Sequence, residues 1–344
     1  MCSFFSGGTP SSSKKEYYDG NIPFIRSGEL HDDQTELFIT EDGLKNSAAK
    51  MVEVGDLLLA LYGATSGDIA ISKINGAINQ AILCIRTEQS KKFIESIWYK
   101  HAGKLLQTYL QGGQGNLSAD IVKNISFYFA TIEEQKKLAK FISLLDERIA
   151  TQNKIIEKYE SLIKGIAQHC IKESISGITY VKLGDICQIT TGKLDANAQV
   201  DNGIYPFFTC AEKPFKIDNF AFDTEALLIS GNGANLGYIN YYKGKFNAYQ
   251  RTYVLDLFSE NIQYIKWALK VLLPKRIAIE KSLSNTPYIV LSTLTDLRLP
   301  LPCKSEQSFI ANLMQSLEGI LSNQIAQYDS YYYLKQYLLR QMFI

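Results

Sequence analysis

Two long stretches of the chain carry apolar residues at alternating steps of four and three. The first begins near residue 131, and adding 172 to each of its positions gives the second. This spacing forms one apolar stripe along a helix and is typical of a coiled coil. The two stripes are Leu138, Ile142, Leu145, Ile149, Gln152, Ile156, Tyr159, Ile163, Ile166 and Cys170, and then Ile310, Met314, Leu317, Leu321, Gln324, Tyr328, Tyr331, Lys335, Leu338 and Met342.

Polar residues inside the stripes indicate how the two helices pair. Gln152 and Gln324 hold the same place in each stripe, and Lys335 interrupts the second. Because the second half of the chain must return towards its start, we expect an antiparallel pair with a pseudo-two-fold axis near the glutamines. A polar pair in a seam fixes its register. The alternative is that each helix packs on its own globular part.

The remaining segments predict mixed globular parts. A capping box of Thr131 and Glu134 begins the first long helix. Each globular part contains short apolar runs typical of buried strands, one amphipathic helix and a short closing strand. The predicted strands are 57–62, 78–86 and 125–129 in the first part and 226–230, 249–257 and 297–301 in the second, and the predicted helices are 91–110 and 260–281.

The chain consists of two similar copies. Matches occur in the same order through both halves, at offsets near half of the 344 residues, which indicates an internal repeat. The matches are 63–69 with 233–239, Gln80 with Gln250, Trp98 with Trp267, and 134–135 with 306–307.

The repeat predicts an α+β fold. Two mixed α/β domains, related by a pseudo-two-fold axis, would be separated by a long antiparallel two-helix coiled coil. The predicted parts are a first domain over 1–130, a central helix over 131–178, a second domain over 179–303 and a C-terminal helix over 304–344.

Composition narrows the function classes. The chain is 46% hydrophobic and 21% charged, which is typical of a globular protein rather than a disordered one. Its net charge of +1 argues against nucleic-acid binding through bulk charge, so such binding would need local patches or a partner's charge. No apolar run reaches the ~18 residues of a membrane span, and the start of the chain does not resemble a secretory signal.

The cysteines and histidines do not suggest a metal site. The six cysteines and three histidines are scattered, without the short ligand spacings of a zinc site. Scattered single cysteines without a signal indicate a reducing cytoplasm.

Several segments resemble the specificity subunit of type I restriction–modification enzymes. Segments 7–10 and 18–30 resemble the start of that family's target recognition domain, and the glycine-containing region around 55–81 resembles its middle. The run Glu133-Glu134-Gln135 before a long helix resembles the family's conserved spacer region, and 181–186 resembles the opening of a second recognition domain. The resemblance spans essentially the whole chain, including the order domain, helix, domain, helix.

The first copy departs from this pattern. It begins at Cys2 and lacks the segment 182–185 that precedes Cys187 in the second copy. Either the true start lies upstream or a rearranged gene has lost that segment. The opening strand of the first domain is therefore expected to be incomplete.

The resemblance implies a non-catalytic subunit that binds double-stranded DNA. In the family, each domain reads one half of a split, asymmetric sequence, and the two helices set the unread gap. Modification subunits dock near the helices and methylate adenine with S-adenosylmethionine, and restriction subunits that use ATP and Mg can join them. The chain itself is expected to bind no cofactor, metal or membrane.

Candidate DNA contacts lie on the loops of both domains. Polar side chains on loops read base edges, whereas contacts to phosphates only position the protein. The alternative is that the glycine-rich runs are plain turns and the lysines are solvated. The candidates are Lys14, Lys15, Thr65, Ser66, Gln111, Gln114 and Asn116 in the first domain and Asn232, Asn235, Lys243, Lys245, Arg251, Lys281, Ser284 and Asn285 in the second.

Two other functions compete with this interpretation. Residues 285–288 (Asn-Thr-Pro-Tyr) resemble the tetrapeptide of DNA adenine methyltransferases, but Thr286 replaces its first proline. No glycine-rich cofactor site accompanies it, and no proline precedes an aspartate as in a common class of metal nucleases. The other alternative is a coiled-coil scaffold without a DNA role.

Overall fold

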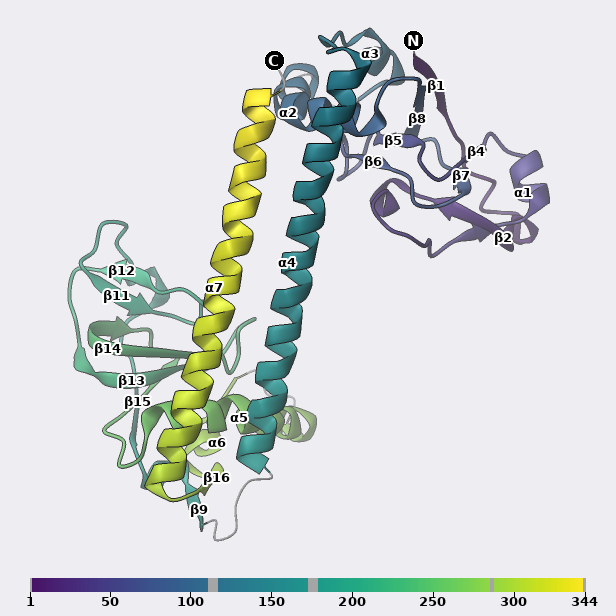
Figure 1. The fold of residues 1–344 in the computed structure, drawn as a ribbon. Coiled ribbons are helices and arrows are strands. Elements are labelled where there is room, and N and C mark those ends of the chain that lie inside the picture. Colours follow the sequence, from purple (N-terminus) through teal and green to yellow (C-terminus); the bar gives the residue numbers. More distant parts are fainter. Residues whose placement is uncertain (1, 111–116, 173–178, 285–287, 343–344) are drawn as a thin grey trace. The chain divides into compact units, whose positions relative to one another are not determined.

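The computed structural model describes residues 2–110, 117–172, 179–284 and 288–342 (Figure 1). The chain forms two compact units, of which unit 1 comprises residues 1–153 and 327–344 and unit 2 comprises residues 154–326. Each unit thus contains one globular part and one segment of each long helix.

The globular part of unit 1 contains two small sheets. Its helices are α1 (Glu41–Lys45), α2 (Lys91–Leu110) and α3 (Ala119–Asn124), and its strands are β1 (Cys2–Ser6), β2 (Tyr18–Ile25), β3 (Phe38–Ile39), β4 (Lys50–Val52), β5 (Leu57–Ala60), β6 (Ile69–Ile71), β7 (Gly76–Ile78) and β8 (Ile82–Thr87). One sheet has the order β1-β8-β5-β6 and the other the order β3-β2-β7-β4. Within the second sheet, β2 and β7 run parallel.

The globular part of unit 2 joins its strands into one larger sheet. Its helices are α5 (Ile262–Ser284) and α6 (Leu291–Thr295), and its strands are β9 (Thr179–Lys182), β10 (Gln188–Thr191), β11 (Tyr205–Phe208), β12 (Phe215–Ile217), β13 (Phe222–Ser230), β14 (Ile239–Ala248), β15 (Thr252–Asp256) and β16 (Arg298–Leu301). Six strands follow the order β10-β15-β13-β14-β11-β12, and β16 pairs with β9 separately.

The two units share one strand order. At an offset of 170, β14 covers the counterparts of both β6 and β7, and β13 covers the counterpart of β5 and begins at Phe222, the counterpart of Val52 at the end of β4. The six-stranded sheet of unit 2 is therefore the continuous form of the two sheets of unit 1. The predicted repeat of mixed α/β parts is confirmed at the level of topology.

Alternating side chains divide each sheet between two cores. Leu57 and Leu59 of β5 pack on the side of α2, whereas Leu58 joins a second cluster on the opposite side. Leu227 and Leu228 of β13 divide in the same way. Because successive strand residues point to opposite faces, a run that is buried on both sides reads as continuously apolar.

The two long helices are α4 (Ile132–Lys172) and α7 (Lys304–Met342). In unit 1 the first part of α4 packs on the last part of α7, where Ile142 and Leu339 share one buried cluster. In unit 2 the last part of α4 packs on the first part of α7, where Ile163 and Met314 share another. Each pairing joins the start of one helix to the end of the other, so the predicted antiparallel pair is confirmed.

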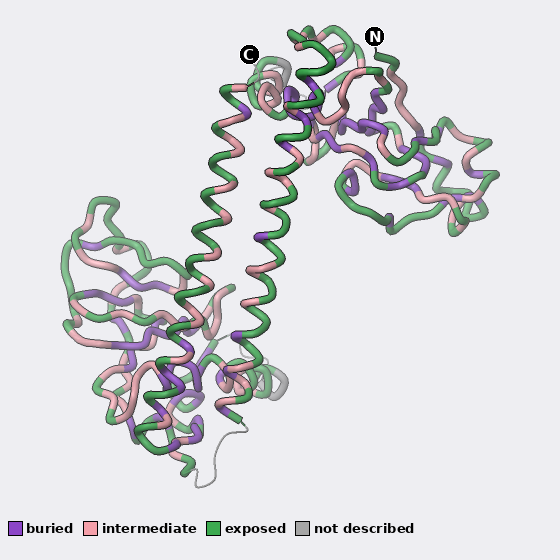
Figure 2. Tube along the Cα trace, viewed as in Figure 1, coloured by how far each residue is buried: buried purple, intermediate pink, exposed green. Residues whose placement is uncertain are grey.

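The predicted seam agrees with the burial pattern along both helices. Every one of its residues is buried or half-buried (Figure 2), and Gln152 is 2% exposed. Lys335 fits the seam because its Nζ lies 2.5 Å from Asp146 Oδ1. The alternative packing occurs alongside the helix pair, since Ile142 also contacts Phe93 of α2 in the same cluster. No helix among the described residues combines the length and apolar character needed to cross a membrane.

One buried glutamine per unit ties a long helix to the globular part. In unit 2, Gln307 Nε2 donates to Glu260 Oε2 at 2.8 Å and to the carbonyl of Pro302, and Gln307 Oε1 accepts from the backbone N–H of Asn261. Gln135 makes the same three kinds of bond in unit 1. Both side chains are 1% exposed. We call each arrangement a glutamine bridge.

Replacing Gln307 by leucine is expected to lower the free energy of unfolding of unit 2 by about 3 kcal/mol. The change leaves a buried N–H, a carbonyl and a carboxylate without their partner, and such groups cost about 1–3 kcal/mol each. Urea unfolding followed by circular dichroism measures the loss. Gln315, which is exposed on the same helix, provides the control, since Gln315→Leu should change stability by less than about 0.5 kcal/mol. Equal effects of the two variants would contradict the role of the bridge.

The tryptophan match in the repeat is wrong. The glutamine bridges bind Ser90 and Asn261 in the same way, which aligns α2 with α5 at an offset of 171. That offset places Leu269, and not Trp267, opposite Trp98. Trp98 Nε1 donates to the carbonyl of Gly67 at 2.7 Å, whereas the ring of Trp267 lies under the ammonium of a lysine in its own helix.

The predicted strand over 125–129 is also wrong. These residues form no strand, although their counterpart β16 pairs with β9 along its full length. The sequence has the apolar character of a strand, but no strand among the described residues lies beside it to form a ladder. An extended segment becomes part of a sheet only when a neighbour supplies the hydrogen bonds.

Candidate nucleic-acid interface

Three segments meet at one corner of each unit through equivalent backbone bonds. In unit 2, Gly231 N–H donates to the Arg251 carbonyl at 2.8 Å, and Ile289 N–H donates to the Gly231 carbonyl at 2.8 Å. In unit 1, Leu61 N–H donates to the Ala81 carbonyl at 2.8 Å, and the N–H of residue 117 donates to the Leu61 carbonyl at 2.7 Å. We call each of these places a loop corner. The loop corner of unit 1 comprises residues 61–67, 80–81 and 117, and that of unit 2 comprises residues 231–237, 250–251 and 288–289.

A glycine-dependent turn shapes each loop corner. Gly63 and Gly67 have φ of 87° and 86°, and their counterparts Gly233 and Gly237 have φ of 79° and 83°. Only glycine adopts this left-handed region without strain. The N–H of Gly67 and of Gly237 each closes the turn with a 2.8 Å bond to a strand carbonyl. The turns that the sequence singled out are thus rigid supports for the residues between their glycines.

The loop corner of unit 2 contains a small hollow with polar walls. It encloses about 230 Å³ and is lined by Thr191, Gly231, Gln250, Arg251, Tyr253 and Ile289. Arg251 is exposed, and its guanidinium lies 6.0 Å from the ring centre of Tyr288. Among the described residues, no carboxylate forms an ion pair with Arg251. Its five N–H donors are therefore available to a ligand.

The two asparagines of this turn have defined roles. Asn232 Oδ1 accepts from the Cys210 thiol at 3.0 Å, and Asn235 Nδ2 donates to the Cys210 carbonyl at 3.0 Å. The turn is therefore attached to the segment after β11 that carries Cys210. The remaining donor group of Asn232 and the acceptor group of Asn235 can still hydrogen-bond a base edge.

The loop corner of unit 1 presents different side chains. Ala81 occupies the position of Arg251 and is buried. The Ser66 hydroxyl donates to the Leu61 carbonyl at 2.9 Å, so it holds the turn, while Thr65 is half-buried. Thr9 donates to Gln80 Oε1. The same backbone frame thus carries an arginine in one unit and an alanine in the other.

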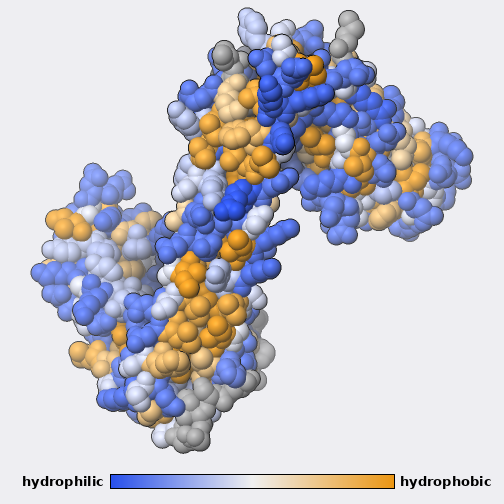
Figure 3. Space-filling model, in the orientation of Figure 1, coloured by the Kyte–Doolittle hydropathy of each residue, from blue (hydrophilic) through white to orange (hydrophobic). Residues whose placement is uncertain are grey.

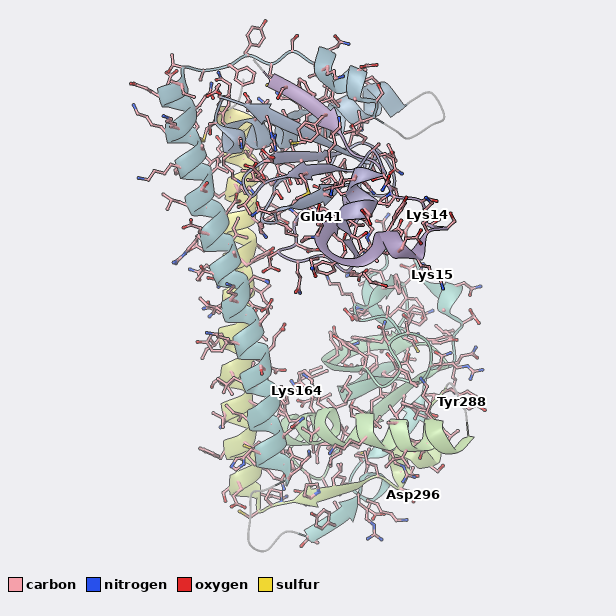
Figure 4. All side chains as sticks on the ribbon, turned by 90° about the vertical axis from the view of Figure 1, so that its right-hand side faces the viewer. Lys14, Lys15, Glu41, Lys164, Tyr288 and Asp296 are labelled. Carbon is pink, nitrogen blue, oxygen red and sulfur yellow. The ribbon has the colours of Figure 1, made fainter. Side chains whose placement is uncertain are left out.

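The candidate lysines belong to segments other than those that form the loop corners. Lys14 donates to the Tyr17 hydroxyl at 2.9 Å, which raises the pKa of the ammonium, and Lys15 next to it is exposed (Figure 4). On β14, Lys243 lies 3.3 Å from Glu225, and Lys245 lies over the ring of a phenylalanine. Lys281, on the last turns of α5, is exposed.

Other candidates fall at the limits of the described structure. Gln111, Gln114, Asn116 and Asn285 lie outside the described residues, and Ser284 is the last residue of α5. Sequence reasoning missed Thr191, Gln250 and Tyr288. Gln250 could have been found, because it is the repeat partner of Gln80. In the described ranges, no three His, Cys, Asp or Glu side chains come together in a way that could hold a metal ion.

Comparisons with known proteins place both units in one family. A family model described as the type I restriction modification DNA specificity domain matches residues 1–161 and 175–328. The specificity subunit of the Escherichia coli type I restriction enzyme EcoDI is 44% identical over 137 residues, which cover 40% of this chain and 30% of that protein. The specificity subunit of MjaVIII from Methanocaldococcus jannaschii is 24% identical over 365 residues, covering 92% of this chain and 84% of that protein.

Solved structures with the same fold agree with that assignment. The S subunit of a type I restriction-modification system from M. genitalium has a TM-score of 0.67 at 16% identity and covers 100% of this chain and 94% of its own. A chain from a study of complex assembly in the type I R-M system has a TM-score of 0.63 at 16% identity, covering 98% and 96%. With the family model spanning both globular parts and much of both long helices, the chain belongs to the type I restriction–modification DNA specificity family.

Proposed function

We propose that each globular part reads one half of a split, asymmetric DNA sequence in a type I restriction–modification complex. The observation that carries this proposal is the pair of loop corners, which share their backbone bonds but not their side chains. Two DNA-binding sites with the same backbone arrangement suit a sequence made of two half-sites, as in dimeric DNA-binding proteins. Their different side chains would make the half-sites different in sequence.

Arg251 is the strongest base-reading candidate at these corners. Arginine contacts the O6 and N7 atoms of guanine with two hydrogen bonds, the commonest specific contact in the major groove. Arg251 is exposed, directly precedes strand β15 and has no carboxylate partner among the described residues. The second half-site would therefore include a guanine, whereas Ala81 offers no such contact in the first.

The paired helices would set the distance between the half-sites and bind the modification subunits. Apolar side chains gather over the long helices on the face drawn in Figure 3. On α4, Leu144 and Leu162 are about half exposed, and on α7 Phe309 is 68% exposed. A contiguous exposed apolar patch of the kind drawn there is typical of a protein–protein contact.

The chemistry of the complex would reside in its other subunits. In this proposal the chain is non-catalytic and acts in the cytoplasm, modification subunits carry S-adenosylmethionine, and restriction subunits use ATP and Mg. Of the methyltransferase-like run 285–288, only Tyr288 is described, and it forms a β-bridge with Asn232 of the loop corner. This position supports a role for Tyr288 in shaping the corner.

The variant Arg251→Ala is expected to relax the sequence preference at one base pair of the second half-site. Loss of a bidentate contact removes about 1–3 kcal/mol of discrimination, or roughly 5- to 150-fold. The chain is purified with its modification subunits and measured against duplexes that carry each single substitution of the methylated sequence, at one salt concentration.

Two outcomes would contradict base reading by Arg251. If the variant weakens all duplexes equally, Arg251 contacts a phosphate instead. If it changes nothing, Arg251 lies away from the DNA. Lys243→Ala is the control, because Lys243 already pairs with Glu225 and its loss should preserve the preference at every position.

A further inference from the structure

A hollow with a largely apolar surface lies between three helices of unit 2. It encloses about 500 Å³ and shares no lining residue with the hollow at the loop corner. The last part of α4 and the middle of α5 supply most of its walls, and the first part of α7 supplies the rest. We call it the helix hollow. Its apolar lining residues are Ile163, Ala167, Trp267, Val271, Pro274 and Leu321.

Positive charge exceeds negative charge at the helix hollow. Three lysines and two glutamates line it. Glu318 lies 3.0 Å from Lys270 Nζ, and the ammonium of a further α5 lysine also reaches Glu318, at 2.8 Å. Lys164 on α4 (Figure 4) and Lys275 on α5 are exposed. Among the described residues, neither of these two pairs with a carboxylate, so both ammonium groups are available to an anion.

Unit 1 carries a larger side chain where Ala167 lines the helix hollow. At the offset of 172, the counterpart of Ala167 is Leu339, which is 4% exposed and packs in one cluster with Phe93 of α2. The counterpart of Ile163 is Lys335, which pairs with an aspartate of α4. The shared arrangement of helices therefore accommodates a leucine at this place, and the alanine of unit 2 leaves space there.

We propose that the helix hollow binds a small amphipathic anion, which is a molecule with an apolar body and one carboxylate, sulfonate or phosphate group. The apolar body would lie against Trp267, Val271 and Leu321. The anionic group would bind the unpaired ammonium groups of Lys164 and Lys275. The volume and the lining agree with this choice, because small-molecule sites typically enclose about 300–1,000 Å³ and combine apolar walls with a few polar groups that orient the ligand.

The length of the helix hollow identifies a suitable probe. Its lining residues extend from 160 to 168 on α4 and from 267 to 275 on α5. Either span corresponds to about 12 Å along a helix. An extended ten-carbon fatty acid has about this length and carries its carboxylate at one end. Decanoate is therefore the probe that the dimensions favour.

Isothermal titration calorimetry of the full-length chain with decanoate tests the site. We expect saturable binding of one molecule per chain with a Kd of about 100 μM or lower. Acetate lacks the apolar body, and decyltrimethylammonium carries the opposite charge. Both should bind at least about tenfold more weakly than decanoate.

Two variants that fill the helix hollow locate the apolar part of the site. Ala167→Leu introduces the residue that unit 1 carries at the counterpart position and should weaken decanoate binding by about tenfold or more. Val271→Trp fills the same space from α5 and should have the same effect. Thermal unfolding followed by circular dichroism checks that the variants fold, and decanoate should raise the Tm of the unaltered chain but not of the filled variants.

A pair of lysine substitutions locates the anionic part of the site. Lys164→Gln combined with Lys275→Gln should weaken decanoate binding by about fivefold or more, because both unpaired ammonium groups are lost. Lys158→Gln is the matched control. Lys158 is exposed on the same helix and does not line the helix hollow, so its loss should leave the Kd unchanged.

Four outcomes would overturn the proposal. They are no saturable binding of decanoate, equal binding of decanoate and decyltrimethylammonium, undiminished binding to a folded variant with the hollow filled, and equal effects of the double lysine variant and the Lys158→Gln control. None of these results depends on DNA, so they leave the proposed reading function untouched.

Discussion

Replacing residues 179–303 with the corresponding domain of another specificity subunit is expected to change one half of the methylated DNA sequence and leave the other half unchanged. The structural reason is that the unit 2 globular part contains its own sheet and its own loop corner. Sequencing of methylated adenines in cells that carry the chimaera and its modification subunits measures both halves at once.

The design of this chimaera follows from the core of unit 2. The globular part shares one buried cluster with both long helices, through residues such as Ile163 and Met314. A donor domain must therefore present an apolar face to α4 and α7, and it must keep Gln307 bridged to the start of α5. Retention of the complete original sequence by a folded chimaera would contradict the assignment of one reader to each domain.

Inserting one heptad into both long helices is expected to lengthen the unread gap by about three base pairs. Seven helical residues add about 10.5 Å, and each base pair of DNA spans about 3.4 Å. The pairs Asp146 with Lys335 and Arg148 with Tyr331 give the register of the seam. If this register continues, the peptide bond after Asn153 lies opposite the peptide bond before Gln327. The two heptads are therefore inserted at these two bonds.

A single insertion controls for this experiment. A heptad added to α4 alone breaks the match between the stripes of the two helices, so we expect loss of methylation rather than a longer gap. The double insertion keeps the existing pairing of the two stripes on both sides of the inserted heptads and should preserve activity at the new spacing. An unchanged gap in an active double variant would contradict the role of the helices as a spacer.

The seam was predictable because the alternating spacing of four and three residues extends over ten positions in each helix. A heptad stripe needs only the sequence, and even its polar members, Gln152 and Lys335, have buried or paired places in the structure. The glutamine bridges could not be predicted in the same way. Gln135 and Gln307 were visible as a repeat match, but their bonds to the start of α2 and α5 depend on tertiary contact.

The two predictions that were wrong, the tryptophan match and the strand over 125–129, rested on residue type alone. Trp98 and Trp267 have nearly the right spacing, yet the bridges show that they occupy different positions. The segment 125–129 has strand-like residues, but a strand also needs a neighbour, which the described residues of unit 1 do not provide. The difference between Ala81 and Arg251 emerged only when backbone bonds aligned the two corners.

The most direct test of the central claim is methylome sequencing of the host with and without the gene for this chain. The account predicts one methylated sequence that is present only with the gene and consists of two different short halves separated by a fixed stretch of unspecified bases. A continuous or palindromic sequence, or methylation that does not depend on the gene, would contradict it.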